Sequence, residues 1–165
     1  MSTKVRNLQD LLIEQLQDLY SAEEQILEAL PKVERKINNQ KLKDAIHKHL
    51  EETKGQKGRL DQIAVLLKVD LGKRKCKAIE GILAEAESFM KEDAKADVMD
   101  AGIIANAQRV EHYEIAGYGT VIAYAERLGL QETTSLLKET LEEEKKADSK
   151  LTELAVETIN EEALS

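Results

Sequence analysis

Four long stretches of this chain place apolar residues at alternating spacings of three and four, which is the period of one face of an α-helix. The stretches run from about Thr3 to Ile37, Gln40 to Lys68, Lys95 to Leu128 and Gln131 to Asn160. A helix with one apolar stripe has to bury that stripe against other helices. The repeated pattern therefore predicts a four-helix bundle.

The connections between these stretches indicate how the bundle is wound. Asn38 and Asn39 predict a short turn after the first helix. Residues 69–77 form a connection, and Ala78 to Met90 form a short helix, between the second and third long helices. A crossover of this length lets the third helix run in a direction that a tight turn would forbid. No linker divides the chain, so we expect one domain over residues 1–165.

Composition supports an all-α fold and narrows the functions. Aromatic residues make up 3% of the chain and there is one proline, which suits helices better than sheets. The net charge of -8 argues against nucleic acid or an anionic membrane as partner, because both normally require a basic surface. Cys76 is the single cysteine, so no intrachain disulfide forms. With no apolar signal segment at the start, we expect a cytoplasmic protein.

Each predicted long helix carries an acidic residue at or beside its apolar stripe, namely Glu23, Glu52, Glu111 and Glu144. An ionised carboxylate is costly to bury alone, so it must be paired, neutralised or bound to a metal. Counting helical rise from the turn at Gly129 places Glu144 near Glu114, and Asp148 near Glu111. The acids of each helix pair are therefore expected to meet in one layer of the core.

Converging carboxylates repel one another unless protons or cations neutralise them. A pair of divalent metal ions would do so, as in bundles that hold two iron or two manganese ions between carboxylates. A site with many carboxylates and few imidazoles suits iron or manganese better than copper. The competing interpretation is a layer of protonated acids and buried water that fixes how the helices pack.

Five segments carry a resemblance to a known family. They are Tyr20–Gln25, His49–Thr53 followed by Gln56, Lys75–Gly81, Val110–Gly119, and Leu137–Glu144 followed by Asp148. In these segments the chain resembles the YciF-like bacterial branch of the ferritin-like superfamily. The resemblance implies a ferritin-like four-helix bundle with a long crossover, a homodimer and a link to stress responses. It also directs attention to one set of candidate metal ligands: Glu23, His49, Glu52, Glu111, Glu114, Glu144 and Asp148.

The chain departs from ferritin-like di-iron proteins in one motif. Those proteins usually carry Glu-x-x-His on the second and fourth helices. Here Gly55 stands three residues after Glu52, and Ala147 stands three residues after Glu144. His49 is either a ligand or a core histidine hydrogen-bonded to a carboxylate. The sequence predicts a stress protein that handles iron, peroxide or oxygen at a pair of iron or manganese ions, the alternative being a non-enzymatic dimeric interaction protein with a degenerate site.

Overall fold

The computed structural model describes residues 5–164, and their secondary structure is helical. The helices are α1 (Leu8–Lys36), α2 (Gln40–Leu67), α3 (Lys77–Phe89), α4 (Ala96–Arg127) and α5 (Gln131–Leu154), followed by a π-helical turn η1 (Ala155–Ile159) and α6 (Asn160–Glu162). The predicted all-α bundle with a short helix in its crossover is therefore confirmed. None of the helices within this range is long and apolar enough to cross a membrane.

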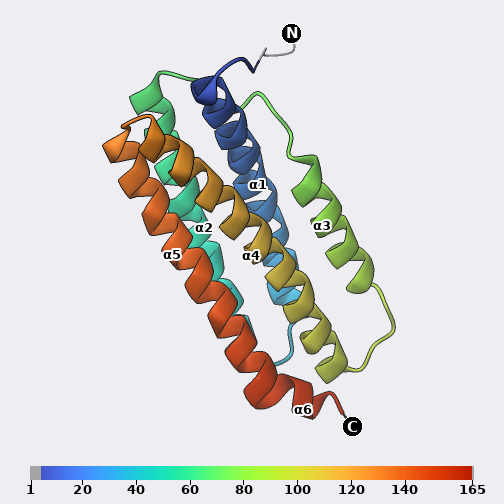
Figure 1. Ribbon diagram of the computed structural model, residues 1–165. Coiled ribbons are helices and arrows are strands. Elements are labelled where there is room, and N and C mark those ends of the chain that lie inside the picture. Colours follow the sequence, from blue (N-terminus) through green and yellow to red (C-terminus); the bar gives the residue numbers. More distant parts are fainter. Residues whose placement is uncertain (1–4, 165) are drawn as a thin grey trace.

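The four long helices form a closed ring in which α1 packs on α2 and α4, and α5 packs on the same two helices. Helix α3 lies outside this ring against α1 and α4 (Figure 1). Because the crossover, a loop followed by α3, runs back along the bundle before α4 begins, α4 points in the same direction as α2 (Figure 1). The predicted role of the crossover in setting the direction of the third long helix is thus confirmed.

Helix boundaries follow the capping residues of the sequence. Helix α1 begins at Leu8 rather than at the predicted Thr3, because the side chain of Asn7 accepts a hydrogen bond from the backbone N–H of Asp10 at 2.8 Å and caps the helix there. Thr3 itself lies outside the described residues. The last predicted helix is also not regular to Asn160, because its backbone widens into the turn η1 after Leu154.

The turn between α1 and α2 is held by a residue of α4. The backbone N–H groups of Asn38 and Asn39 donate to the two carboxylate oxygens of Asp100, at 2.9 and 2.7 Å. Asp100 is buried, and Asn39 in turn caps α2 through its own side chain. The predicted turn is present, and its two otherwise unpaired donors are satisfied from the other half of the chain.

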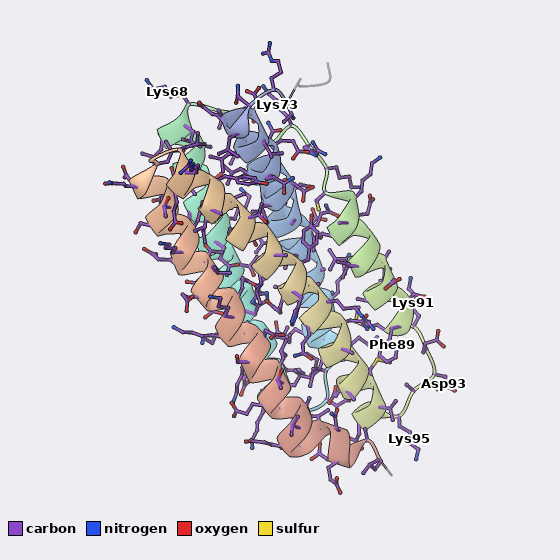
Figure 2. The ribbon with its side chains drawn as sticks, in the orientation of Figure 1. Lys68, Lys73, Phe89, Lys91, Asp93 and Lys95 are labelled. Carbon is purple, nitrogen blue, oxygen red and sulfur yellow. The ribbon has the colours of Figure 1, made fainter. Side chains whose placement is uncertain are left out.

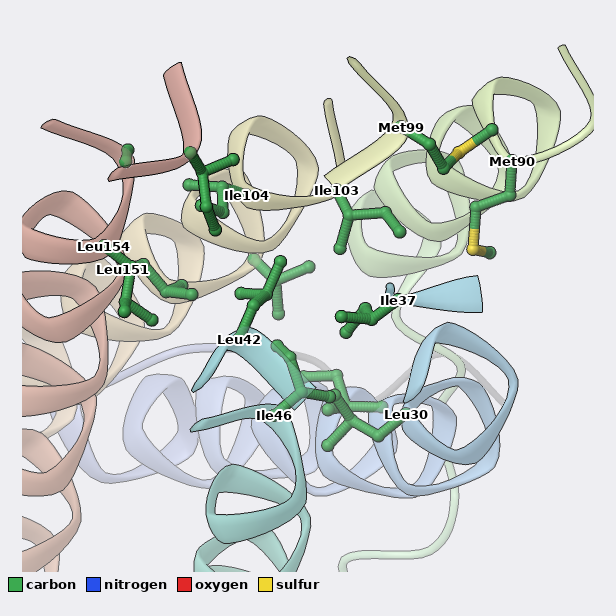
Figure 3. Packing of buried hydrophobic residues seen from close by; sticks show 14 of the residues in the cluster. Leu30, Ile37, Leu42, Ile46, Met90, Met99, Ile103, Ile104, Leu151 and Leu154 are labelled. Carbon is green, nitrogen blue, oxygen red and sulfur yellow. The ribbon is translucent and has the colours of Figure 1, made fainter. Parts of the chain in front are cut away.

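Two apolar clusters fill the bundle, one toward each end. The first, part of which Figure 3 shows, packs Leu30, Ile37, Leu42, Ile46, Met99, Ile103, Ile104, Leu151 and Leu154 together. The second contains Leu12, Leu16, Leu19, Leu60, Ile63, Tyr118, Val121, Ile122 and Leu137. On each long helix, the residues of one cluster precede a short polar segment and those of the other follow it. A polar layer therefore lies across the middle of an otherwise apolar core.

The end of α3 docks on α4 through a glycine. Phe89, labelled in Figure 2, is the last residue of α3, and its ring lies over Gly102. A Cβ atom at position 102 would come within 2.0 Å of that ring, so the contact depends on the missing side chain. Gly119 lies on the same helix, and a Cβ added there would meet nothing within 4 Å.

This pair of glycines gives a matched test of packing. We expect Gly102→Ala to lower the thermal midpoint, because Phe89 must leave its place and overpacking of this kind costs about 1–3 kcal/mol. Gly119→Ala should leave the midpoint unchanged or raise it, since alanine favours a helix over glycine by about 1 kcal/mol. Thermal melts followed by circular dichroism compare the two variants. Equal midpoints for both would show that Phe89 does not need the space at Gly102.

Candidate metal centre

The polar layer brings seven side chains into the core, each as the continuation of an apolar stripe. They are Glu23 of α1, His49, Thr53 and Gln56 of α2, Glu111 and Glu114 of α4, and Glu144 of α5. Each is at most 4% exposed, so the layer is closed to bulk water. In α2, for example, His49, Thr53 and Gln56 follow Ile46 and precede Leu60 at spacings of three and four. The same helical period that buries the aliphatic residues therefore buries these polar ones.

Four of these side chains form a compact group of potential ligands. His49, Glu111, Glu114 and Glu144 each offer one ligand atom, and the four atoms lie within 4.8 Å of one another. His49 Nε2 is 3.3 Å from Glu111 Oε1. Protein ligands bind a first-row ion at about 2.0–2.2 Å, so atoms on opposite sides of one ion are about 4 Å apart. The group therefore has the dimensions of a site for a metal ion, with only small adjustments needed.

Many polar atoms of the layer have no hydrogen-bond partner among the described residues. They are both ring nitrogens of His49, both oxygens of Glu114, one oxygen each of Glu23, Glu111 and Glu144, and Gln56 Oε1. The contact of His49 with Glu111 has the distance of an ion pair but not the alignment of a hydrogen bond. Each unpaired buried polar atom costs about 1–3 kcal/mol of folding free energy. A layer with this many of them therefore needs a partner that hydrogen-bonds to them or coordinates them. A cation bound by carboxylates and an imidazole supplies one.

Two hydrogen bonds orient acids of the layer. The hydroxyl of buried Tyr118 donates to Glu23, and the amide of Gln56 donates to Glu144. Gln56 also donates to Glu143 at 3.1 Å, and Arg59 holds Glu143 through two contacts of 2.6 and 2.8 Å. Gln56 thus lies beside the group of four as a hydrogen-bond partner of Glu144. Partners of this kind fix the rotamer of a carboxylate and so tune any metal it binds.

Burial and crowding make these carboxyl groups weak acids. Desolvation, followed by repulsion from Glu144, raises the pKa of Glu23 to about 8, although the hydrogen bond from Tyr118 works in the opposite direction. The pKa values of Glu111 and Glu114 also lie well above the ordinary value, mainly through burial and then through Glu144. Without a cation, the layer at neutral pH therefore retains protons that exposed glutamates would have lost.

Three predicted ligands lie outside the group of four: Glu23, which belongs to the buried layer and accepts from Tyr118, and Glu52 and Asp148. Glu52 is half-buried and pairs with Lys48 at 3.3 Å. The expectation of one inward acid per helix is therefore not met: α2 turns His49 and Gln56 inward instead, while α4 contributes two acids. Around the axis of α2, Glu52 lies about 100° from Thr53, which is at the centre of the buried face of the helix.

Asp148 lies one turn beyond Glu144, at the edge of the layer. Its carboxylate accepts a hydrogen bond from Gln108 at 3.1 Å and lies 3.4 Å from the ring of exposed His112. As ligands, Glu52 and Asp148 stay predictions, and each would require a side-chain rotation to join the group.

Tyr118 belongs to the site although it was not among the residues predicted there from the sequence. Tyr118 is fully buried, and burial together with the nearby charge of Glu23 raises its pKa well above the ordinary value, so it remains a hydrogen-bond donor. One signal was present in the chain: Tyr118 stands four residues after Glu114 and seven after Glu111, on the same face of α4. A tyrosine at that spacing from two inward acids is a candidate donor to the layer.

Comparisons with known proteins agree closely with this architecture. The family model described as Domain of unknown function (DUF892) matches residues 7–164. Protein YciF of Escherichia coli (strain K12) is 47% identical over 160 residues, which is 96% of each chain. The crystal structure of the E. coli stress protein YciF superimposes with a TM-score of 0.91 over 94% of this chain and 99% of that one. YcfI from Rhodopseudomonas palustris, 45% identical, gives a TM-score of 0.89 over 92% and 97% of the two chains.

Proposed function

This chain belongs to the family described as Domain of unknown function (DUF892), and from that premise we propose that it is a stress-response protein whose core binds divalent iron or manganese. The link to stress comes from its similarity to YciF, which is described as a stress protein. The observation that carries the metal is the buried group of His49, Glu111, Glu114 and Glu144, with ligand atoms within 4.8 Å of one another.

The donor set favours particular ions. Three carboxylates and one imidazole are hard to borderline ligands, which suit Fe²⁺ or Mn²⁺ and offer no thiolate for softer ions. The positive charge of a divalent ion would offset both the burial and the mutual repulsion that otherwise keep these acids protonated. Glu23, Gln56 Oε1 and the free oxygens of Glu114 and Glu144 would hold a second ion, because these atoms are buried without partners.

The proposed reaction is with a small oxidant such as peroxide or oxygen. Bound iron or manganese would supply the capacity for electron transfer to it. The residues of this chain hold the ions, exclude bulk water and keep donors aimed at the acids. Tyr118 orients Glu23 by a hydrogen bond from its hydroxyl group, and Gln56 orients Glu144 by a hydrogen bond from its amide to one carboxylate oxygen. These two contacts limit which carboxylate oxygens remain available to an ion.

Replacement of one central ligand tests the site. We expect Glu111→Ala to weaken binding of Mn²⁺ or Fe²⁺ by at least about tenfold, because it removes a ligand rather than an outer partner. Glu51→Ala is the matched control, since Glu51 is an exposed acid of α2 that pairs with Lys54 at 2.6 Å and is not a candidate ligand. Titration calorimetry and metal analysis of anaerobically loaded protein measure affinity and stoichiometry. Unchanged metal content in Glu111→Ala would remove the site from this layer.

A second candidate function is a dimeric interaction protein whose polar layer only fixes helix packing. Val65 and Leu66 favour a contact with a second chain, because these neighbours at the end of α2 are 77% and 40% exposed. The homodimer itself stays a prediction, which sedimentation velocity measures directly. Failure of both wild-type protein and Glu51→Ala to bind metal would favour this second function.

A further inference from the structure

The candidate ligands are closed to bulk water, so an ion needs a route to reach them. Two of them, His49 and Glu111, are 4% and 2% exposed. Both line a cavity of about 50 Å³ between α2 and α5. The charged residues of the same wall are Glu52, Lys48, Lys146 and Lys150. Because the side chains of Lys48 and Lys150 are 71% and 48% exposed, this cavity joins the protein surface to the buried ligand group.

The buried side of this wall carries atoms without partners. Both ring nitrogens of His49 and one carboxylate oxygen of Glu111 are buried and make no hydrogen bond among the described residues. Buried polar atoms of this kind normally have a protein, water or ion partner. The cavity therefore leads from charged surface residues to atoms that are free to bind a cation.

Glu52 stands part of the way along this route. Its side chain is 22% exposed, and its counter-ion is Lys48, at 3.3 Å. An ion pair between a partly exposed acid and a largely exposed lysine contributes little to stability, because water screens both charges. A divalent cation can therefore take the place of Lys48 beside this carboxylate. Glu52 thus offers a ligand to an arriving ion before the ion reaches the buried group.

A second cavity touches the same two ligands but suits a hydrated ion less well. Apart from His49, Glu111 and Asn106, its lining consists of alanine, valine, leucine, isoleucine and methionine side chains. The amide of Asn106 already donates to the backbone oxygen of Gly102 at 3.0 Å and accepts from Arg109 at 2.9 Å. An ion that sheds water along this wall would gain no carboxylate in exchange before it met Glu111.

We infer that the cavity between α2 and α5 is the entry route for divalent cations, and that Glu52 is the carboxylate that receives them. Glu52 accepts the ion in place of Lys48 and passes it to His49 and Glu111, which line the same cavity. This inference rests on the proposed function, since it assigns the path by which the candidate metal centre is filled. It gives Glu52 a part in metal loading that does not require it to remain a ligand.

A residue of the route has a kinetic signature that a permanent ligand lacks. It changes the association and dissociation rate constants by the same factor, because their ratio is fixed by the bound state, which it does not touch. We expect Glu52→Gln to lower both rate constants for Mn²⁺ by about tenfold, the low end of what charge steering contributes to association. The Kd should stay nearly unchanged. Lys48→Met, which frees the carboxylate of Glu52, should raise both rate constants several-fold.

The second ion pair of α2 supplies matched controls. Glu51 and Lys54 lie 2.6 Å apart on the exposed face of the same helix, and neither lines the cavity. Glu51→Gln and Lys54→Met should therefore keep the rate constants of the wild-type protein. Stopped-flow mixing of metal-free protein with Mn²⁺ and a fluorescent chelator as reporter measures association. Mixing of loaded protein with excess EDTA measures dissociation, and calorimetric titration gives the Kd.

The outcomes separate the entry route from the metal centre. Wild-type rate constants in Glu52→Gln, together with normal affinity, would overturn the inference and leave the proposed function standing. A weaker Kd in Glu52→Gln that arises from faster dissociation alone would make Glu52 a permanent ligand, which also overturns the inference. Absence of Mn²⁺ binding by the wild-type protein would overturn the proposed function and the entry route together.

Discussion

Metal-free protein is expected to lose stability as the pH rises from 6 to 8. The pKa of Glu23 is about 8 in the folded protein against an ordinary value of 4.5, so the native state binds more protons than the unfolded state between these values. Stability therefore falls as the pH climbs through this window. The loss is on the order of 2 kcal/mol for Glu23 alone from pH 6 to 8, which lowers the melting temperature by roughly 5 °C. Glu111 and Glu114, whose pKa values are also raised, act in the same direction.

Saturating Mn²⁺ or Fe²⁺ should abolish this pH dependence, because carboxylates that bind a metal are deprotonated in the native state as they are in the unfolded state. Metal that binds only the native state also stabilises it by RT ln(1 + [L]/Kd). Replacing Glu23 and Glu144 together by Gln should flatten the apo profile and remove the stabilisation by metal. Glu51→Gln, which changes an exposed acid of α2 that is not a candidate ligand, should leave both effects in place. Melts at pH 6 and 8, with chelator and with metal, measure all three proteins. Melting temperatures indifferent to pH, metal and the double substitution would favour a purely structural polar layer.

A tighter metal site is expected from Thr53→Glu combined with Gln56→His. Both positions are fully buried and point into the layer, so together they place Glu-x-x-His on the inward face of α2. Glu52 does not supply this motif, because Gly55 stands where its histidine would be and Glu52 lies at the side of the buried face of α2. We expect at least about a tenfold gain in affinity for Fe²⁺, the scale on which ligand changes act at metal sites. Ferrous oxidation should also become faster than in the wild-type protein.

The same double substitution should destabilise the metal-free protein, since it adds a carboxylate to a group that already repels itself. Thr53→Gln with Gln56→His is the matched control, because it keeps size and imidazole but adds no charge. Calorimetric titration and a ferrous oxidation assay compare the variants. Affinity that stays flat in the double variant would show that the inward face of α2 does not reach the ions.

Much of the fold was predictable because apolar stripes, turns and caps agree with one another along the chain. The crossover helix was placed within one residue at each end, and the turn at Asn38 and Asn39 was correct. Two features lay beyond the periodicity. The π-helical turn η1 leaves the apolar pattern nearly unchanged, and the contact of Asp100 with the first turn joins residues far apart in the chain. Local pattern carries no signal for either.

The candidate site was predictable where acids interrupt strongly apolar stripes. Glu23, Glu111 and Glu144 stand between aliphatic neighbours, and all three are buried as expected. Helix α2 is different, because its middle is a polar run in which neighbouring positions cannot be ranked by hydropathy. The structure turns Thr53 inward and leaves Glu52 at the flank. The single domain over residues 1–165 stays a prediction.

The two hydrogen bonds that Asp100 accepts from the turn between α1 and α2 can form only late during synthesis. In the turn between α1 and α2, the backbone N–H groups of Asn38 and Asn39 lack their carboxylate partner until Asp100 has left the ribosome. Asp100 stands 61 positions after Asn39. At about 5–20 residues per second, that delay amounts to roughly 3–12 s. Glu111, Glu114 and Glu144 emerge later still, so a nascent chain with only α1 and α2 exposed has His49 and Glu23 but not the rest of the ligand group. Under the proposed function, a metal ion could therefore enter the complete group only after Glu144, in the last long helix, has been translated.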